Sequence, residues 1–175
     1  FERLIRDLFE REWETDDAQA NGRSGQKQAG VDVYGTDRRH NKWVGIQCKG
    51  RTGGFSGKVT DKELRDEVEK AKGFLPKLDK FILATTAPND VNLQKVAREL
   101  NEKHSENQLF EVSVLSWDEI KVYLDRHPQV SRRHLSGVSG LAQSILMDVV
   151  TEALAAGSRP MNDIAQPREI SATST

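Results

Sequence analysis

Residues 30–49 read GVDVYGTDRRHNKWVGIQCK, and this stretch decides the fold of the chain. Two runs rich in apolar residues, at 31–34 and 42–49, flank a polar segment at 37–41. Such a pattern predicts two antiparallel strands joined by a turn. The chemistry of the chain depends on which side chains the two strands place on the same face.

Successive side chains point to opposite faces of a strand. We therefore expect one apolar face that covers a core, formed by Val31, Val33, Val44, Ile46 and Cys48. Asp32, Gln47 and Lys49 would then project together from the opposite face. Because positions 32 and 47 are equally far from the centre of the turn, Asp32 and Gln47 are predicted to be cross-strand neighbours.

Helices and strands alternate in the rest of the chain. Apolar spacing and β-branched runs predict helices at 1–13, 60–75, 91–104 and about 116–126, and strands at 81–86 and 110–115. Two helix starts, Thr60–Glu63 and Ser116–Glu119, have the pattern of a capping box. This order predicts an α/β protein, with a mixed sheet flanked by helices on both sides.

The polar face of the hairpin would bring a carboxylate, an amide and an ammonium group together. Mg²⁺ binds proteins through one or two carboxylates, together with phosphate and water oxygens. Asp32 would supply the main carboxylate and Gln47 a neutral amide oxygen. Lys49 would orient the attacking water and stabilise the charge that develops on a phosphoryl group. The grouping therefore suits hydrolysis of phosphodiesters.

The segment Gly30-Val31-Asp32-Val33, followed by Gln47-Cys48-Lys49, resembles the motifs of the PD-(D/E)XK nuclease superfamily. More narrowly, it resembles the Mrr-like branch, in which Gln replaces the acidic residue of the second motif. The likeness covers about residues 1–125 and implies a restriction-endonuclease-like core of the α-β-β-β-α-β type. The region 74–91 is similar to the N-terminal nuclease domains of prokaryotic antiphage defence proteins of the Cap4 and Avs types.

That branch carries a Glu on its first helix near a phenylalanine, and Phe1-Glu2 matches this feature. The resemblance thus implies four catalytic side chains, of which the first three hold Mg²⁺, or Mn²⁺ in its place: Glu2, Asp32, Gln47 and Lys49. Glu10 and Glu12 are alternatives for the ligand on the helix.

The chain has 175 residues, with 26 Lys and Arg against 27 Asp and Glu, so its formal net charge is −1. Between residues 33 and 60, however, the only acidic residue is Asp37. A basic stripe on a nearly neutral protein suits contact with a phosphate backbone. The cations predicted to bind double-stranded DNA are Arg38, Arg39, Lys42, Arg51 and Lys58. An ordinary solvated hairpin is the alternative interpretation.

We expect a nuclease domain at 1–130, an amphipathic helix at 131–156 and a linker at 157–175. The polar tail and the missing initial Met lead us to expect a longer polypeptide with a sensor or NTPase domain. No apolar run approaches the ~20 residues of a membrane span. The single cysteine, Cys48, fits a reducing compartment, so a cytoplasmic location is expected.

Together these features predict a Mg²⁺-dependent deoxyribonuclease that cuts double-stranded DNA in restriction or antiphage defence. We expect it to act as a homo-oligomer, because two-fold symmetry places one site on each DNA strand. Two alternatives are kept: a catalytically inactive nucleic-acid-binding domain of the same fold, and a protein-interaction or oligomerisation module that uses the C-terminal helix.

Overall fold

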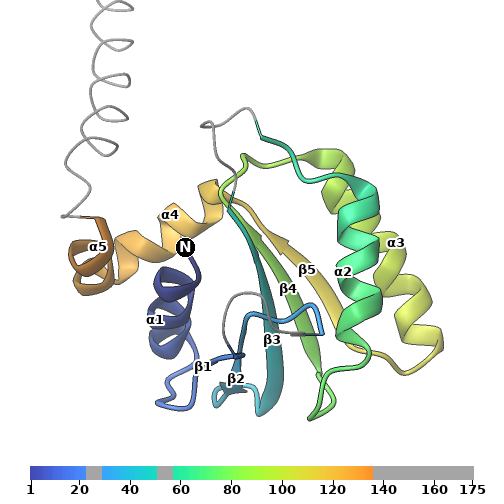
Figure 1. Cartoon of the computed structure of the whole chain (residues 1–175), viewed down its shortest axis with the longest axis horizontal. Helices are drawn as coiled ribbons and strands as arrows, with labels where there is room; N and C mark the ends of the chain where they lie inside the picture. The colour runs from blue at the N-terminus through green and yellow to red at the C-terminus, as the bar shows by residue number, and fades with distance from the viewer. Residues whose placement is uncertain (23–28, 51–56, 136–175) are drawn as a thin grey trace, which may run out of the picture. The chain divides into compact units, whose positions relative to one another are not determined.

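A five-stranded mixed sheet is the centre of the computed structural model, which describes residues 1–22, 29–50 and 57–135 (Figure 1). Its strands lie side by side in chain order: β1 (Gln19–Ala20), β2 (Val33–Asp37), β3 (Lys42–Lys49), β4 (Lys80–Thr85) and β5 (Glu111–Leu115). The first three strands pair antiparallel, whereas β3, β4 and β5 run parallel. The predicted α/β class and mixed sheet are confirmed. The two-residue β1, at the edge of the sheet, was not predicted, because so short a strand has no readable alternation.

The helices of the described residues are α1 (Glu2–Glu12), α2 (Asp61–Ala71), α3 (Val91–Glu106), α4 (Trp117–Arg126) and α5 (Pro128–Leu135). Figure 1 shows α2 and α3 on one face of the sheet and α1 and α4 on the other. The connections β3–α2–β4 and β4–α3–β5 advance in the same direction across the sheet. Right-handed crossovers therefore place both helices on the same face. Both predicted capping boxes are present, at the starts of α2 and α4.

The register of the hairpin agrees with the prediction. Val33 pairs with Ile46, and Asp37 pairs with Lys42, so Asp32 lies opposite Gln47 at the entry to β2. A Cβ atom built on Gly45 would lie 2.7 Å from Leu78, which assigns the face of Gly45 to the α2–α3 side. By alternation, the face of Gln47 and Lys49 is also the α2–α3 side.

The expected position of Val31 is wrong. Val31 is fully buried in the core between the sheet and α2 and α3, whereas Val33 shares the opposite face of the sheet with Ile46. The chain bends at Asp32, just before β2 begins, so strict alternation does not extend back to Val31. That core is formed mainly by Leu64, Val68, Phe74, Phe81, Leu83, Leu93, Val96 and Leu100.

By its contacts the chain divides into two units, Phe1–His134 and Leu135–Thr175. The first unit therefore ends at His134, near the end of α5, rather than at the predicted residue 130. Beyond Leu135, the predicted C-terminal helix and the linker at 157–175 lie outside the described residues. In the described part of the chain, no helix is both long and apolar enough to cross a bilayer.

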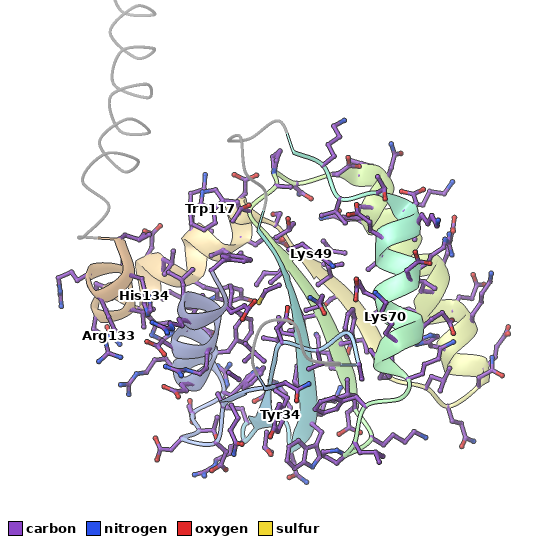
Figure 2. The ribbon with its side chains drawn as sticks, viewed as in Figure 1. Tyr34, Lys49, Lys70, Trp117, Arg133 and His134 are labelled. Atoms are coloured by element: carbon purple, nitrogen blue, oxygen red, sulfur yellow. The ribbon has the colours of Figure 1, made fainter. Side chains whose placement is uncertain are left out.

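Buried carboxylates on α1 hold the C-terminal helices in place. Asp7 accepts hydrogen bonds from His134 Nε2 at 2.8 Å and from Arg133 Nη1 at 3.2 Å, and Figure 2 shows both labelled residues on α5 beside α1. Near the end of α1, Glu12 Oε1 lies 2.7 Å from His127 Nε2. Burial opposes ionisation of Asp7, but its hydrogen bonds with Arg6, His134 and Arg133 outweigh burial and lower its pKa to about 2.

Replacing Asp7 with Asn should destabilise the unit by about 1–2 kcal/mol at pH 7, a modest figure because the partner arginines are exposed. Since the pKa of Asp7 is lower in the folded chain than its ordinary 3.8, the stabilisation is present above about pH 4 and is lost as the pH falls towards 2. Urea unfolding of wild type and D7N at pH 7 and pH 3 measures the difference in the free energy of unfolding and its loss at low pH. Asp125→Asn, at an exposed residue, is the control. Equal losses in D7N at pH 7 and in the control would contradict the assignment.

Candidate functional site

The parallel strands β3 and β4 end together, and the candidate site lies at this edge of the sheet. Lys49, the last residue of β3, pairs with Thr85, whose Oγ1 donates a hydrogen bond to the Lys49 carbonyl at 2.9 Å. A Cβ atom on Gly50 would lie 3.9 Å from Phe1, so α1 begins beside the end of β3. The carboxyl ends of parallel strands are where α/β proteins most often bind ligands.

Asp32 is held firmly and is almost entirely buried. Only 5% of its surface is exposed. Its Oδ2 accepts two hydrogen bonds, from Gln47 Nε2 at 2.5 Å and from the backbone N–H of Cys48 at 2.7 Å. Its own N–H donates to the carbonyl of Ile46 at 2.8 Å. The predicted cross-strand contact between Asp32 and Gln47 is therefore present, and it fixes the carboxylate on the face that carries Lys49.

The pKa of Asp32 is raised, chiefly because burial disfavours its charged form. The negative charges of Glu2 and Glu67 raise this pKa further, whereas the Cys48 N–H and the Lys49 ammonium oppose the shift. Acidic side chains from α1 and α2 thus lie close enough to act on Asp32. A bound cation would favour the ionised form of such a carboxylate, so Asp32 is suited to bind one.

Glu67 is a buried acid on α2 that was not among the predicted site residues. Its Oε1 accepts hydrogen bonds from Lys49 Nζ at 2.7 Å and from Lys70 Nζ at 3.0 Å. Burial opposes its ionisation, but these two lysines outweigh burial and lower its pKa. The sequence held a signal: Glu67 lies three residues after Leu64 and four before Ala71, on the buried side of the helix. An acid at such a position needs a partner from another element.

Gly30 brings the segment that carries Asp32 against α2. It has a φ of +67°, in the left-handed region that favours glycine. A Cβ atom there would lie 2.9 Å from the Glu67 carbonyl and 3.2 Å from Glu67 Oε2. The Gly30–Asp32 part of the predicted motif therefore needs its glycine for direct contact with the turn of α2 that carries Glu67.

Glu2 is exposed in the first turn of α1, and its charge acts on Asp32. The alternatives lie farther along the helix: Glu10 is about 12 Å and Glu12 about 15 Å from Glu2 by the helical rise. Glu12 is in addition bound to His127 and faces a different hollow. Among the three candidates on α1, Glu2 is the one beside the site.

The oxygen atoms of the acidic and amide side chains at the site are of the kind that bind a hard cation. Glu2, Asp32 and Glu67 offer carboxylate oxygens, and the hydrogen bond of Gln47 uses its nitrogen rather than its amide oxygen. Mg²⁺ and Mn²⁺ prefer such ligands. Within residues 1–22, 29–50 and 57–135, however, no three His, Cys, Asp or Glu side chains are already grouped as a metal site. The residues fit the ion by type, and their donors are not preassembled around it.

Most of the predicted DNA-binding cations lie elsewhere. Arg38 pairs with Asp17 at 3.2 Å, Arg39 with Glu12 at 3.5 Å, and Lys42 with Glu111 at 3.7 Å. Lys42 and Lys49 are at opposite ends of β3, roughly 23 Å apart along the strand. Lys58 is exposed and precedes α2, and Arg51 lies outside the described residues.

Arg39 and Lys42 line a separate hollow of about 280 Å³. The rings of Phe9, Trp13 and Tyr123 line it together with them. The basic stripe is therefore split in space, because residues at a hairpin turn and residues at the strand ends are adjacent in sequence only. Asp32 contacts Gln47, and the charges of Lys49 and Glu2 act on Asp32, whereas the arginines of the turn lie at the other end of the hairpin.

No family model, curated protein or solved structure matches the chain. The nuclease likeness therefore depends on the motif residues and their geometry. Asp32, Gln47 and Lys49 are the part of it that has a defined arrangement.

Replacing Asp32 with Asn should stabilise the protein. The variant keeps an oxygen that accepts from Gln47 and Cys48, and it loses a buried charge. The pKa of Asp32 is higher in the folded chain than in the unfolded chain, so the free energy of unfolding of the wild type falls as the pH rises through that pKa. D32N has no carboxyl group to ionise and does not show this fall. We expect a gain of up to about 1 kcal/mol in the free energy of unfolding at pH 7, measured in urea.

The matched control is Asp37→Asn, which changes a carboxylate at the other end of the same hairpin. It should bring no gain, because Asp37 interacts with Arg39 and His40 at the surface. A D32N variant that is less stable than wild type at pH 7 would show that the ionised carboxylate supports the fold.

Proposed function

We propose that the unit Phe1–His134 is a metal-dependent endonuclease domain that hydrolyses phosphodiester bonds of double-stranded DNA. One observation carries the proposal: a buried, electrostatically disfavoured Asp32, fixed by Gln47, shares its face of the sheet with Lys49 at the carboxyl edge. This arrangement costs stability and serves no evident packing role. Such costs are typical of functional sites.

In this proposal Glu2 and Asp32 would hold Mg²⁺ or Mn²⁺, with the Gln47 amide oxygen as a neutral ligand. The ion would lower the pKa of a bound water and neutralise a phosphate oxygen. Gln47 and the Cys48 N–H orient the Asp32 carboxylate. Lys49 would orient the water and stabilise negative charge on phosphorus as the water oxygen bonds to it and one ester P–O bond breaks.

The wider setting is also proposed. Cutting both strands of a duplex requires two sites, which a two-fold homo-oligomer would supply. The motif likeness to antiphage defence proteins supports a cytoplasmic role beside a sensor or NTPase domain. For DNA contact, Lys58 and Arg51 are favoured over the turn cations, because both belong to the connection between β3 and α2, which starts at the carboxyl edge of the sheet.

A second function has an observation in its favour. Because no metal-binding trio is assembled among the described residues, a nucleic-acid-binding domain without cleavage is the alternative. Steep loss of DNA affinity with added salt would accompany either function, so cleavage itself must separate them.

Cleavage of supercoiled plasmid tests the proposal. We expect nicking or linearisation with Mg²⁺ or Mn²⁺, none with EDTA, and losses of at least about 100-fold in Asp32→Asn and Lys49→Ala. Lys42→Ala, a lysine at the other end of β3, is the matched control and should cleave like wild type. Activity that survives both substitutions, or that needs no metal, would refute the nuclease assignment.

A further inference from the structure

We propose that Glu67 is the positioning residue for Lys49, holding its ammonium group at the carboxyl edge of the sheet beside Asp32. This role rests on the proposed nuclease function. Lys49 Nζ lies 2.7 Å from Glu67 Oε1, and Figure 2 shows Lys49 on the side of the sheet that faces α2. A charge-assisted hydrogen bond of this length is among the stronger contacts that a lysine makes.

Lys49 needs such an anchor because of its place and its chemistry. It is the last residue of β3, and its flexible four-carbon stem has many rotamers of similar energy. An unanchored lysine at a strand end would spread its charge over a wide volume. Catalytic groups, in contrast, act only when held close to their productive geometry.

Glu67 is suited to provide the anchor because α2 is rigid where it carries this residue. Its neighbours on the buried side of the helix, Leu64 and Val68, are fully buried, and Ala71 is 2% exposed. The Glu67 side chain itself is 8% exposed, whereas that of Lys49 is 26% exposed. The carboxylate therefore has a fixed position set by core packing, and the partly exposed lysine is held by it.

Lys70 binds the same oxygen from the solvent side, at 3.0 Å, with its side chain 56% exposed. Two ammonium groups on one carboxylate leave a net charge of +1 at this spot. The cluster can thus hold Lys49 in place without cancelling the positive charge that an incoming phosphate would meet. Lys70, labelled on α2 in Figure 2, keeps Glu67 ionised from outside the site.

The location of the pair also agrees with this role. Gly30 packs directly on Glu67, and two residues later Asp32 carries the carboxylate that the charges of Glu67 and Lys49 influence in opposite directions. Glu67 thus contacts the chain segments on both sides of the candidate site. A positioning residue of this kind should affect the chemical step through Lys49 and leave DNA affinity almost unchanged.

Single-turnover cleavage at saturating DNA, with DNA affinity measured separately, tests the proposal. Glu67→Gln should slow cleavage about 10- to 100-fold while the Kd for DNA changes less than about twofold. The matched control is Glu69→Gln, the same change on the same helix, at an exposed residue that pairs with Lys72. It should leave both quantities unchanged. In a Lys49→Ala background, Glu67→Gln should bring no further loss, because it acts through Lys49.

Urea unfolding of the same variants tests the contact without relying on activity. If the pair is formed, the shifts in midpoint of Lys49→Ala and Glu67→Gln will not add in the double variant. Additive shifts, an unchanged cleavage rate in Glu67→Gln, or an equal loss in Glu69→Gln would overturn the positioning role while leaving the nuclease assignment in place. A wild-type chain with no metal-dependent cleavage would instead refute the proposed function, and the positioning role with it.

Discussion

The antiparallel register of β2 and β3 sets Asp32 opposite Gln47, and the rest of the candidate site depends on this pairing. Gln47 and the Cys48 N–H fix one carboxylate oxygen, and the next residue along β3 is Lys49 on the same face. A slip of one residue would turn Gln47 and Lys49 to the face covered by α1. One face of the hairpin thus packs in the core through Val33, Val44 and Ile46, and the other face carries the polar side chains of the site.

Two buried carboxylates at the site differ in their electrostatic balance. Glu67 is ionised with two lysines as partners, so burial is more than offset and its pKa is lowered. Asp32 has a raised pKa, because its hydrogen bonds and Lys49 do not offset burial and the nearby acids. The deficit at Asp32 is what an added cation would remove. This difference agrees with the proposed roles, in which Asp32 binds the cation and Glu67 positions Lys49.

The hairpin could be predicted from sequence because its determinants are local. Period-two alternation and a polar turn define the register, and paired Ser/Thr and Glu residues mark the helix starts. The position of Val31 could not be predicted, because a bend at Asp32 breaks the alternation. Glu67 was missed because its role appears only when α2 packs on the sheet. The arginines of the turn were wrongly predicted to lie near the site. They are close to β3 in sequence, but the turn is at the start of β3 and the site is at its end.

The most direct measurement is a ¹³C NMR titration of the Asp32 side-chain carboxyl with and without Mg²⁺. We expect the pKa of Asp32 to lie above the ordinary 3.8 in the free protein and to fall when Mg²⁺ is added, because a bound cation favours the ionised form. An ordinary or lowered pKa that Mg²⁺ does not change would contradict both the conclusion that burial disfavours ionised Asp32 and its proposed role as a metal ligand.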